Sequence, residues 1–101
     1  MSSVGLNFIK DNYFMLQLLD FYADWCGPCK IMAPVLEEVE KDFSKKLEVK
    51  RIDVEAEGAM AQEFGIFSIP TFVIMKEGKE VSRKEGAMPK EMLRSWINSH
   101  L

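Results

Sequence analysis

The sequence contains two cysteines, Cys26 and Cys29, and two residues separate them. Two thiols at this spacing can close a small disulfide ring and reopen it. An apolar run that includes one acid, Leu18-Leu19-Asp20-Phe21-Tyr22-Ala23, precedes the pair, and an amphipathic stretch over residues 31–43 follows it. A Cys-x-x-Cys between a predicted strand and a predicted helix is typical of a thiol–disulfide redox site.

A helix that begins at the cysteines would activate one of the two thiols. The first backbone N–H groups of a helix have no partner inside the helix, and they favour negative charge on the sulfur of Cys26. Because the thiolate is the attacking species, this placement predicts Cys26 as the nucleophile. Pro28 suits the first helical turn, where no N–H is needed, and Gly27 leaves room for a substrate backbone. We expect Cys29 to be more buried and to react second.

A metal site and a structural disulfide are the other roles open to this cysteine pair. A structural zinc site takes four ligands, and beyond the two cysteines the chain offers a single histidine, His100. A disulfide that closes so short a loop removes little entropy from the unfolded chain. Both roles are therefore disfavoured relative to redox chemistry, and no metal is predicted.

Several motifs, in this order, resemble the thioredoxin family. Residues 20–30, Asp-Phe-Tyr-Ala-Asp-Trp-Cys-Gly-Pro-Cys-Lys, resemble its active-site signature. Ile69-Pro70-Thr71 resembles its cis-proline loop, and Lys76-Glu77-Gly78-Lys79 and Glu85-Gly86-Ala87 resemble its later glycine turns. The resemblance runs from about Leu16 to the end of the chain. It implies an α/β thioredoxin fold, with a mixed central sheet of four to five strands flanked by helices on both faces.

The resemblance also implies a role for each matched residue. Cys26 and Cys29 would be the redox pair, and Asp20 would move protons for Cys29 from behind the disulfide. The surface where partners dock would comprise Trp25, Gly27, Pro28, Ile69, Pro70, Gly86 and Ala87.

Asp20 and Arg51 are the charged residues whose placement matters most. Asp20 lies on the same face of its predicted strand as Leu18 and Tyr22, and burial of an unpaired carboxylate raises its pKa. Position alone is equally compatible with a solvated acid at a strand end; the resemblance favours the proton-handling role. Arg51 stands where family members often carry a lysine near this aspartate. Both a contact with Asp20 and a plain surface cation remain open.

Apolar periodicity predicts strands over residues 13–23, 47–54, 71–76 and 80–84. It predicts helices over residues 31–43 and 55–65, and a last helix that starts at Pro89. This alternation of strands and helices is typical of an α/β domain. Residues 1–12 carry only enough apolar side chains for a short helix, and the first edge strand of the family is expected to be reduced or missing.

Length and charge limit the classes of protein to consider. The 101 residues predict one domain spanning residues 1–101. A formal net charge of -3, with bases and acids interspersed, argues against a broad nucleic-acid surface. No apolar run approaches membrane-spanning length, and the N-terminus does not resemble a secretory signal. We therefore expect a soluble cytoplasmic protein, and in that compartment a paired dithiol is more often catalytic than structural.

These observations predict a protein-disulfide reductase that acts as a dithiol electron carrier and holds no bound cofactor. The resemblance implies reducing equivalents from NADPH through thioredoxin reductase, or from a ferredoxin-linked reductase. Disulfide-containing client proteins would be the other partners, and the chain is expected to be a monomer. Two alternatives stay open: a disulfide isomerase or oxidase, and a redox-inactive thioredoxin-like binding subunit.

Overall fold

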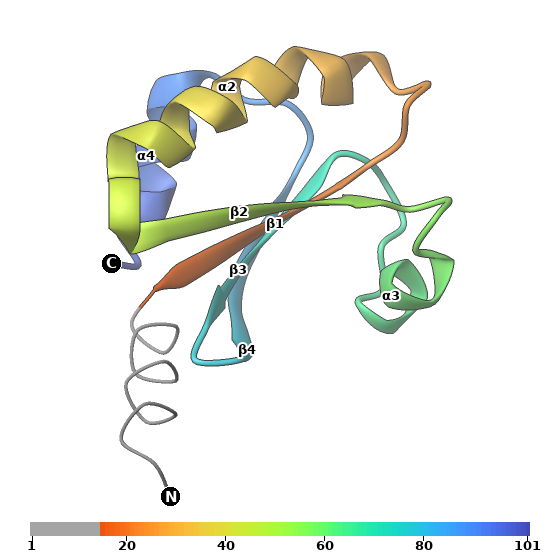
Figure 1. Cartoon of the computed structure of the whole chain (residues 1–101). Helices are drawn as coiled ribbons and strands as arrows, with labels where there is room; N and C mark the ends of the chain where they lie inside the picture. Colours follow the sequence, from red (N-terminus) through yellow and green to blue (C-terminus); the bar gives the residue numbers. More distant parts are fainter. Residues whose placement is uncertain (1–14) are drawn as a thin grey trace, which may run out of the picture.

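The computed structural model describes residues 15–101. The short helix predicted within residues 1–12 and the first edge strand therefore lie outside the described part of the chain. The elements follow one another as β1 (Leu16–Tyr22), α2 (Gly27–Phe43), a 3-10 turn (Ser44–Lys46), β2 (Leu47–Asp53), α3 (Gly58–Glu63), β3 (Thr71–Lys76), β4 (Lys79–Glu85) and α4 (Lys90–Asn98) (Figure 1).

The four strands form one mixed sheet in the order β2-β1-β3-β4. β1 and β2 are parallel because α2 carries the chain from the end of one strand back to the start of the other. β3 runs antiparallel to both β1 and β4. The hairpin between β3 and β4 turns at Glu77 and Gly78, whose φ angles of 55° and 79° suit a tight two-residue turn. This sheet confirms the predicted fold class.

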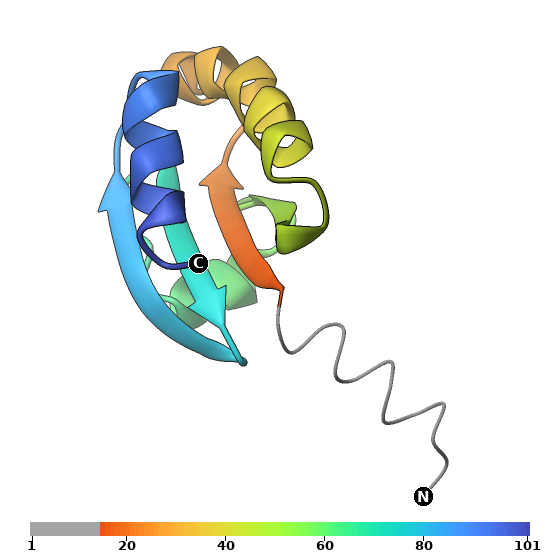
Figure 2. The ribbon, with the colours of Figure 1, turned by 90° about the vertical axis from the view of Figure 1, so that its left-hand side faces the viewer.

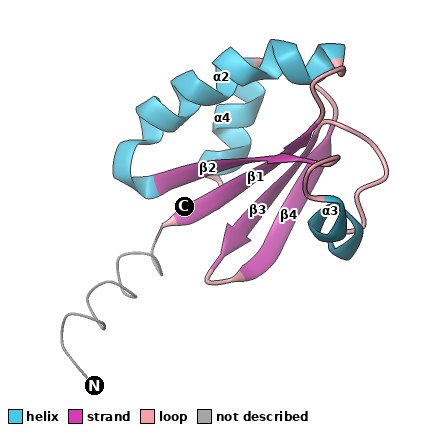
Figure 3. Cartoon of the chain, turned by 45° about the vertical axis from the view of Figure 1, so that its right-hand side comes forward, coloured by secondary structure: helices cyan, strands magenta, loops and turns pink. Residues whose placement is uncertain are grey.

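Helices cover both faces of the sheet (Figures 2 and 3). α2 and α4 pack on one face, where their apolar stripes meet alternate residues of the strands. The largest fully buried side chains of this layer include Leu18, Met32, Leu36, Phe72 and Leu93. α3 covers the other face, over a smaller cluster built on Leu19, Phe21, Ile52, Ala61 and Val73. Residues of β1 alternate between the two clusters, as the two-residue period of a strand requires.

Several predicted boundaries were wrong by a few residues. β1 is described as Leu16–Tyr22 and does not include Ala23, whose carbonyl accepts the Cys26 N–H in a turn at 3.2 Å. α3 begins at Gly58 and not at residue 55, because the Asp53 side chain accepts the Glu55 N–H at 2.9 Å and holds a turn there.

Five further boundaries moved by one to four residues. α2 begins at Gly27, four residues before the predicted start, because the helix includes the cysteine turn. β2 ends at Asp53, and β4 extends over Lys79–Glu85. Pro89 is the residue before the first turn of α4, so the helix itself begins at Lys90.

Candidate active site

The N-terminus of α2 is built around the two cysteines. Cys26 occupies the cap position with an extended backbone, Gly27 is the first helical residue, and Pro28 follows it. The Cys26 Sγ accepts the backbone N–H of Cys29 at 3.2 Å, so the sulfur satisfies one of the unpaired donors of the first turn. The first turn of α2 carries no acidic residue. The partial positive charge of the helix end therefore acts on this sulfur without a nearby carboxylate in that turn to offset it.

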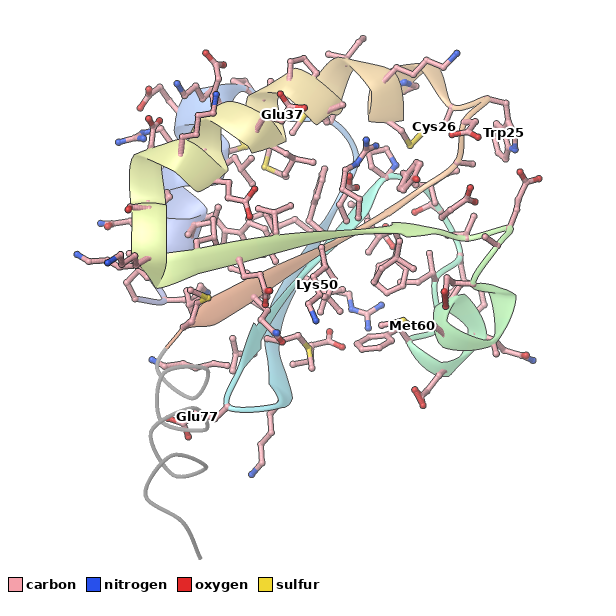
Figure 4. The ribbon with its side chains drawn as sticks, viewed as in Figure 1. Trp25, Cys26, Glu37, Lys50, Met60 and Glu77 are labelled. Carbon is pink, nitrogen blue, oxygen red and sulfur yellow. A yellow bond between two sulfur atoms is a disulfide. The ribbon has the colours of Figure 1, made fainter. Side chains whose placement is uncertain are left out.

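Cys26 and Cys29 form a disulfide whose Cα atoms are 5.2 Å apart. Cys29 is 1% exposed and Cys26 is 5% exposed, which confirms that the second cysteine is the more buried of the two. Figure 4 shows Cys26 next to Trp25 at the turn that leads into α2. Ala23 completes the buried cluster around the disulfide, and the half-buried Tyr22, Val54 and Ile69 pack against it.

Asp20 lies in the middle of the sheet, with its side chain fully buried. Its strand pairs in register with β2, so that Asp20 is opposite Arg51. The Arg51 Nε donates a hydrogen bond to Asp20 Oδ2 at 2.9 Å, and the guanidinium carbon lies 4.0 Å from the centre of the Tyr22 ring. Arg51 thus contacts Asp20, which decides the question that the sequence left open.

Burial raises the pKa of Asp20 above its ordinary value, and the hydrogen bond and charge of Arg51 oppose that rise. Only one carboxylate oxygen meets the arginine. Asp20 Oδ1 is buried and has no hydrogen-bond partner within residues 15–101. A carboxylate oxygen without a partner can still accept a hydrogen bond from a donor that reaches it.

A cavity of about 230 Å³ joins the arginine to the disulfide. Its walls include Tyr22, Cys29, Lys30, Ala33 and Arg51. This volume has room for several water molecules. Water in this cavity would contact both Cys29 and Arg51, the partner of Asp20.

The predicted docking residues come from three loops that the structure brings to the disulfide. The Ile69–Pro70 peptide bond is cis, as the sequence predicted. Ile69 packs against the cysteine cluster, and the Pro70 carbonyl accepts the Gly86 N–H at 2.8 Å. Gly86 has a φ of 89°, a conformation that residues with a Cβ adopt at a cost. The loops after α3 and after β4 are therefore tied to each other beside the disulfide.

These predicted docking residues differ in how much of their surface is exposed to solvent. Trp25 is 67% exposed, and Gly27, Pro28 and Ala87 are also exposed. Ile69 and Gly86 are half-buried, whereas Pro70 is buried and shapes the loop without presenting its ring to solvent.

Sequence reasoning did not assign Tyr22 or Val54 to the site, and it left Arg51 undecided. The missing signal was strand register. Pairing Leu16 with Leu47, the first apolar residues of two seven-residue strands, places Asp20 opposite Arg51 directly.

Within residues 15–101, no three His, Cys, Asp or Glu side chains are grouped so as to hold a metal ion. In the same part of the chain, no helix is long and apolar enough to cross a membrane.

Comparisons with known proteins agree with this geometry. The thioredoxin family profile matches residues 7–99. The chain is 45% identical over 84 residues to a thioredoxin of Bacillus subtilis, covering 83% of this chain and 81% of that protein. It is 44% identical over 84 residues to a thioredoxin of Haemophilus influenzae, covering 83% and 78% respectively.

Solved structures show the same similarity in three dimensions. The X-ray structure of Fasciola hepatica thioredoxin superposes with a TM-score of 0.83 at 36% identity, covering 95% of this chain and 90% of that one. A mutant thioredoxin from Halobacterium salinarum superposes with a TM-score of 0.80 at 31% identity, covering 98% and 85%. With its Cys26–Cys29 disulfide at the start of α2, the chain belongs to the thioredoxin family of thiol–disulfide oxidoreductases.

Proposed function

We propose that the chain is a protein-disulfide reductase in which Cys26 makes the first attack. The reduced Cys26 thiolate attacks one sulfur of a client disulfide, a mixed disulfide forms, and the other client sulfur leaves as a thiolate that takes up a proton. The Cys29 thiolate then attacks Cys26 Sγ, and the second client thiolate leaves. The client disulfide is reduced to two thiols, and the Cys26–Cys29 dithiol is oxidised to the disulfide.

Asp20 would accept the proton of Cys29 before the second attack. Support comes from its buried carboxyl, whose pKa is raised by burial and whose Oδ1 lacks a partner within residues 15–101. A base is most effective when its pKa approaches the working pH. The Arg51 guanidinium donates to this carboxyl through Nε. It would hold the carboxyl in place and would not itself relay the proton.

Clients would dock on the predicted surface of Trp25, Gly27, Pro28, Ile69, Pro70, Gly86 and Ala87. The exposed face of Trp25 and the half-buried Ile69 offer apolar contact area beside the sulfur. A client segment that lies extended across this surface would present its disulfide to Cys26.

We further propose that NADPH supplies the reducing equivalents through thioredoxin reductase, or that a ferredoxin-linked reductase does so. The chain would carry no bound cofactor and would act in the cytoplasm as a monomeric single domain of residues 1–101. Its partners would be the reductase and disulfide-containing client proteins, and it would bind neither nucleic acid nor membrane.

The observation that carries the proposal is the Cys26 sulfur capping α2 at 3.2 Å from the Cys29 amide nitrogen. The test is NADPH-dependent reduction of insulin disulfides in the presence of thioredoxin reductase. We expect turnover by the wild type and a loss of at least about a hundredfold in Cys26→Ser, because the nucleophile is gone.

Cys29→Ser is the matched variant for the second step. It should retain the first attack and accumulate a mixed disulfide with the client, visible by mass spectrometry as one protein plus one client chain. If Cys26→Ser kept the same turnover as the wild type, Cys26 would not be the nucleophile, and a role as a binding subunit would be favoured. A midpoint potential near that of strong thiol oxidants in a glutathione buffer series would instead indicate an oxidase.

A further inference from the structure

Phe67 is the most exposed large apolar side chain of residues 15–101, with 95% of its surface in contact with solvent. A side chain this exposed contributes almost nothing to the hydrophobic core. Isolated exposed apolar residues are common on proteins and need no explanation by themselves. The position of Phe67 relative to the disulfide gives it significance.

Phe67 belongs to the loop that carries the cis-proline. It lies two residues before Ile69, which packs against the cysteine cluster. Because an extended chain spans at most about 3.6 Å per residue, the two Cα atoms are within roughly 7 Å of each other. The Thr71 hydroxyl donates to the Ser68 carbonyl at 2.6 Å, which holds the intervening loop. Phe67 is therefore held next to the surface that we propose for client docking.

The segment that leads into this loop is acidic in sequence, and one cation from outside it, Arg83 of β4, donates to the Phe64 carbonyl at 2.8 Å. Residues 52–75 contain four acids, Asp53, Glu55, Glu57 and Glu63, and none of the 13 lysines and arginines. The three glutamates are exposed. Val54 packs against the cysteine cluster, so Glu55 follows directly after a residue of the site. In Figure 4, α3, where Met60 is labelled, lies at the same end of the molecule as Trp25.

We propose that Phe67 and Glu55, Glu57 and Glu63 form a recognition surface for clients that carry arginine or lysine close to the disulfide cysteine. A cation placed over the exposed ring of Phe67 is attracted to its face. The exposed glutamates of the same segment would attract the same cation and speed its approach. This inference rests on the proposed reductase function and assigns a class of client to it.

The experiment compares three disulfide-linked peptides that differ only in the two residues flanking each cysteine: arginines, glutamines or glutamates. Each oxidised peptide is mixed with reduced protein, and the oxidation of the protein is followed by acid quench and thiol alkylation. We expect the arginine peptide to react about tenfold faster than the glutamate peptide at low salt, with the glutamine peptide between them. The ratio should shrink in about 1 M salt because exposed charges are screened.

The ratio of the arginine rate to the glutamate rate is also the readout for the variants. Phe67→Ser and the double variant Glu55→Gln/Glu57→Gln should each lower this ratio by about threefold. Phe67→Tyr keeps the aromatic face and should preserve it. Glu37→Gln removes one exposed acid from α2, away from Trp25 in Figure 4, and should leave the ratio unchanged.

Equal rates for the arginine and glutamate peptides with the wild type would overturn the inference. So would a preference that survives both Phe67→Ser and the double glutamate variant. Failure of the reduced wild type to react with 2-hydroxyethyl disulfide, which is small and neutral, would instead contradict the reductase function itself.

Discussion

At the scale of single residues, the buried carboxyl of Asp20 is energetically unfavourable, because its Oδ1 has no hydrogen-bond partner within residues 15–101. A buried carboxylate with one partnered oxygen opposes folding when it is ionised. The structure tolerates it with a single cation, Arg51, whose side chain is 38% exposed and therefore still hydrated. Such a group is typical of positions kept for chemistry and not for stability.

Asp20→Asn should therefore stabilise the oxidised protein at neutral pH. Because the folded-state pKa of Asp20 is raised, the native protein holds this proton more tightly than the unfolded chain. Wild-type stability accordingly falls as pH rises from the ordinary value of 3.8 through the raised value. We expect a gain on the order of 1 kcal/mol at pH 7 that vanishes below about pH 4. Urea unfolding at both pH values measures it, and a gain of equal size at both would contradict the assignment.

Removal of the arginine should shift the Asp20 titration upward. Arg51 lowers the pKa of Asp20 by hydrogen bond and charge, while burial raises it. In Arg51→Gln only the burial remains at full strength, so the carboxyl should titrate at a higher pH than in the wild type. Carbon-13 NMR of the Asp20 carboxyl follows this midpoint directly. Arg51→Lys keeps a cation, so its Asp20 midpoint should lie between those of the wild type and Arg51→Gln. An unchanged midpoint in Arg51→Gln would show that Arg51 does not influence the Asp20 carboxyl.

At the scale of elements, the first turn of α2 carries the cysteines, and its later turns pack against the sheet. Its first turn caps the helix with the Cys26 sulfur. Its later turns bury Met32, Leu36 and Val39 against the sheet. The packed part gives the reactive turn a rigid base, which is what a positioned nucleophile needs.

Leu36→Ala and Ile31→Ala separate burial from composition within this one helix. Leu36 is 1% exposed and Ile31 is 67% exposed. We expect Leu36→Ala to lower the free energy of unfolding by about 2–5 kcal/mol. The matched change Ile31→Ala should alter it by about 0.5 kcal/mol or less. Guanidinium unfolding curves give both numbers, and similar costs at the two positions would contradict the packing of α2 described here.

Much of the fold was predictable because apolar periodicity marks its elements. The stripe along α2 and the apolar run of β1 identified the central layer, and β3 was predicted with its bounds intact. The turns were harder, because they depend on single side-chain contacts. One such contact is the Asp53 side chain, which holds a turn before α3, so that the helix begins later than predicted. Another is the Cys26 sulfur, which caps α2, so that this helix begins earlier than predicted.

The site was predictable in part. The cysteine spacing predicted a pair of thiols that can form a disulfide, and the Ile69-Pro70-Thr71 motif predicted the cis proline; the structure shows both. The Asp20–Arg51 contact was not predictable from periodicity, because it depends on how two strands align, and a shift of one residue turns a side chain to the other face. The 95% exposure of Phe67 also needed the structure, since the sequence does not say whether an apolar side chain in a loop is buried.

At the scale of the whole molecule, the last helix completes the main core. Leu93, Trp96 and Ile97 of α4 are buried in the same cluster as the residues of α2. An Arg94–Asp42 ion pair of 2.6 Å also joins the two helices, although an exposed pair of this kind contributes little to stability. α4 therefore supplies a substantial part of the main core.

A chain that stops after Met88 should lose its cooperative unfolding transition. Removing three buried side chains of this size costs about 2–5 kcal/mol each, which is comparable to the whole stability of a small domain. Urea titration followed by circular dichroism should give a broad, shallow change in the shortened chain and a sigmoidal one in the full chain. A sharp transition in the shortened chain would show that α4 is dispensable.

The contact between Asp20 and Arg51 is distant in sequence, whereas the disulfide is local. The two residues are separated by 31 positions, and α2 lies between them. Cys26 and Cys29 meet within the first turn of α2, whereas Asp20 meets its cation only once β1 and β2 have paired. The disulfide therefore needs only one helical turn, whereas the carboxyl proposed to handle its protons depends on the long-range alignment of two strands.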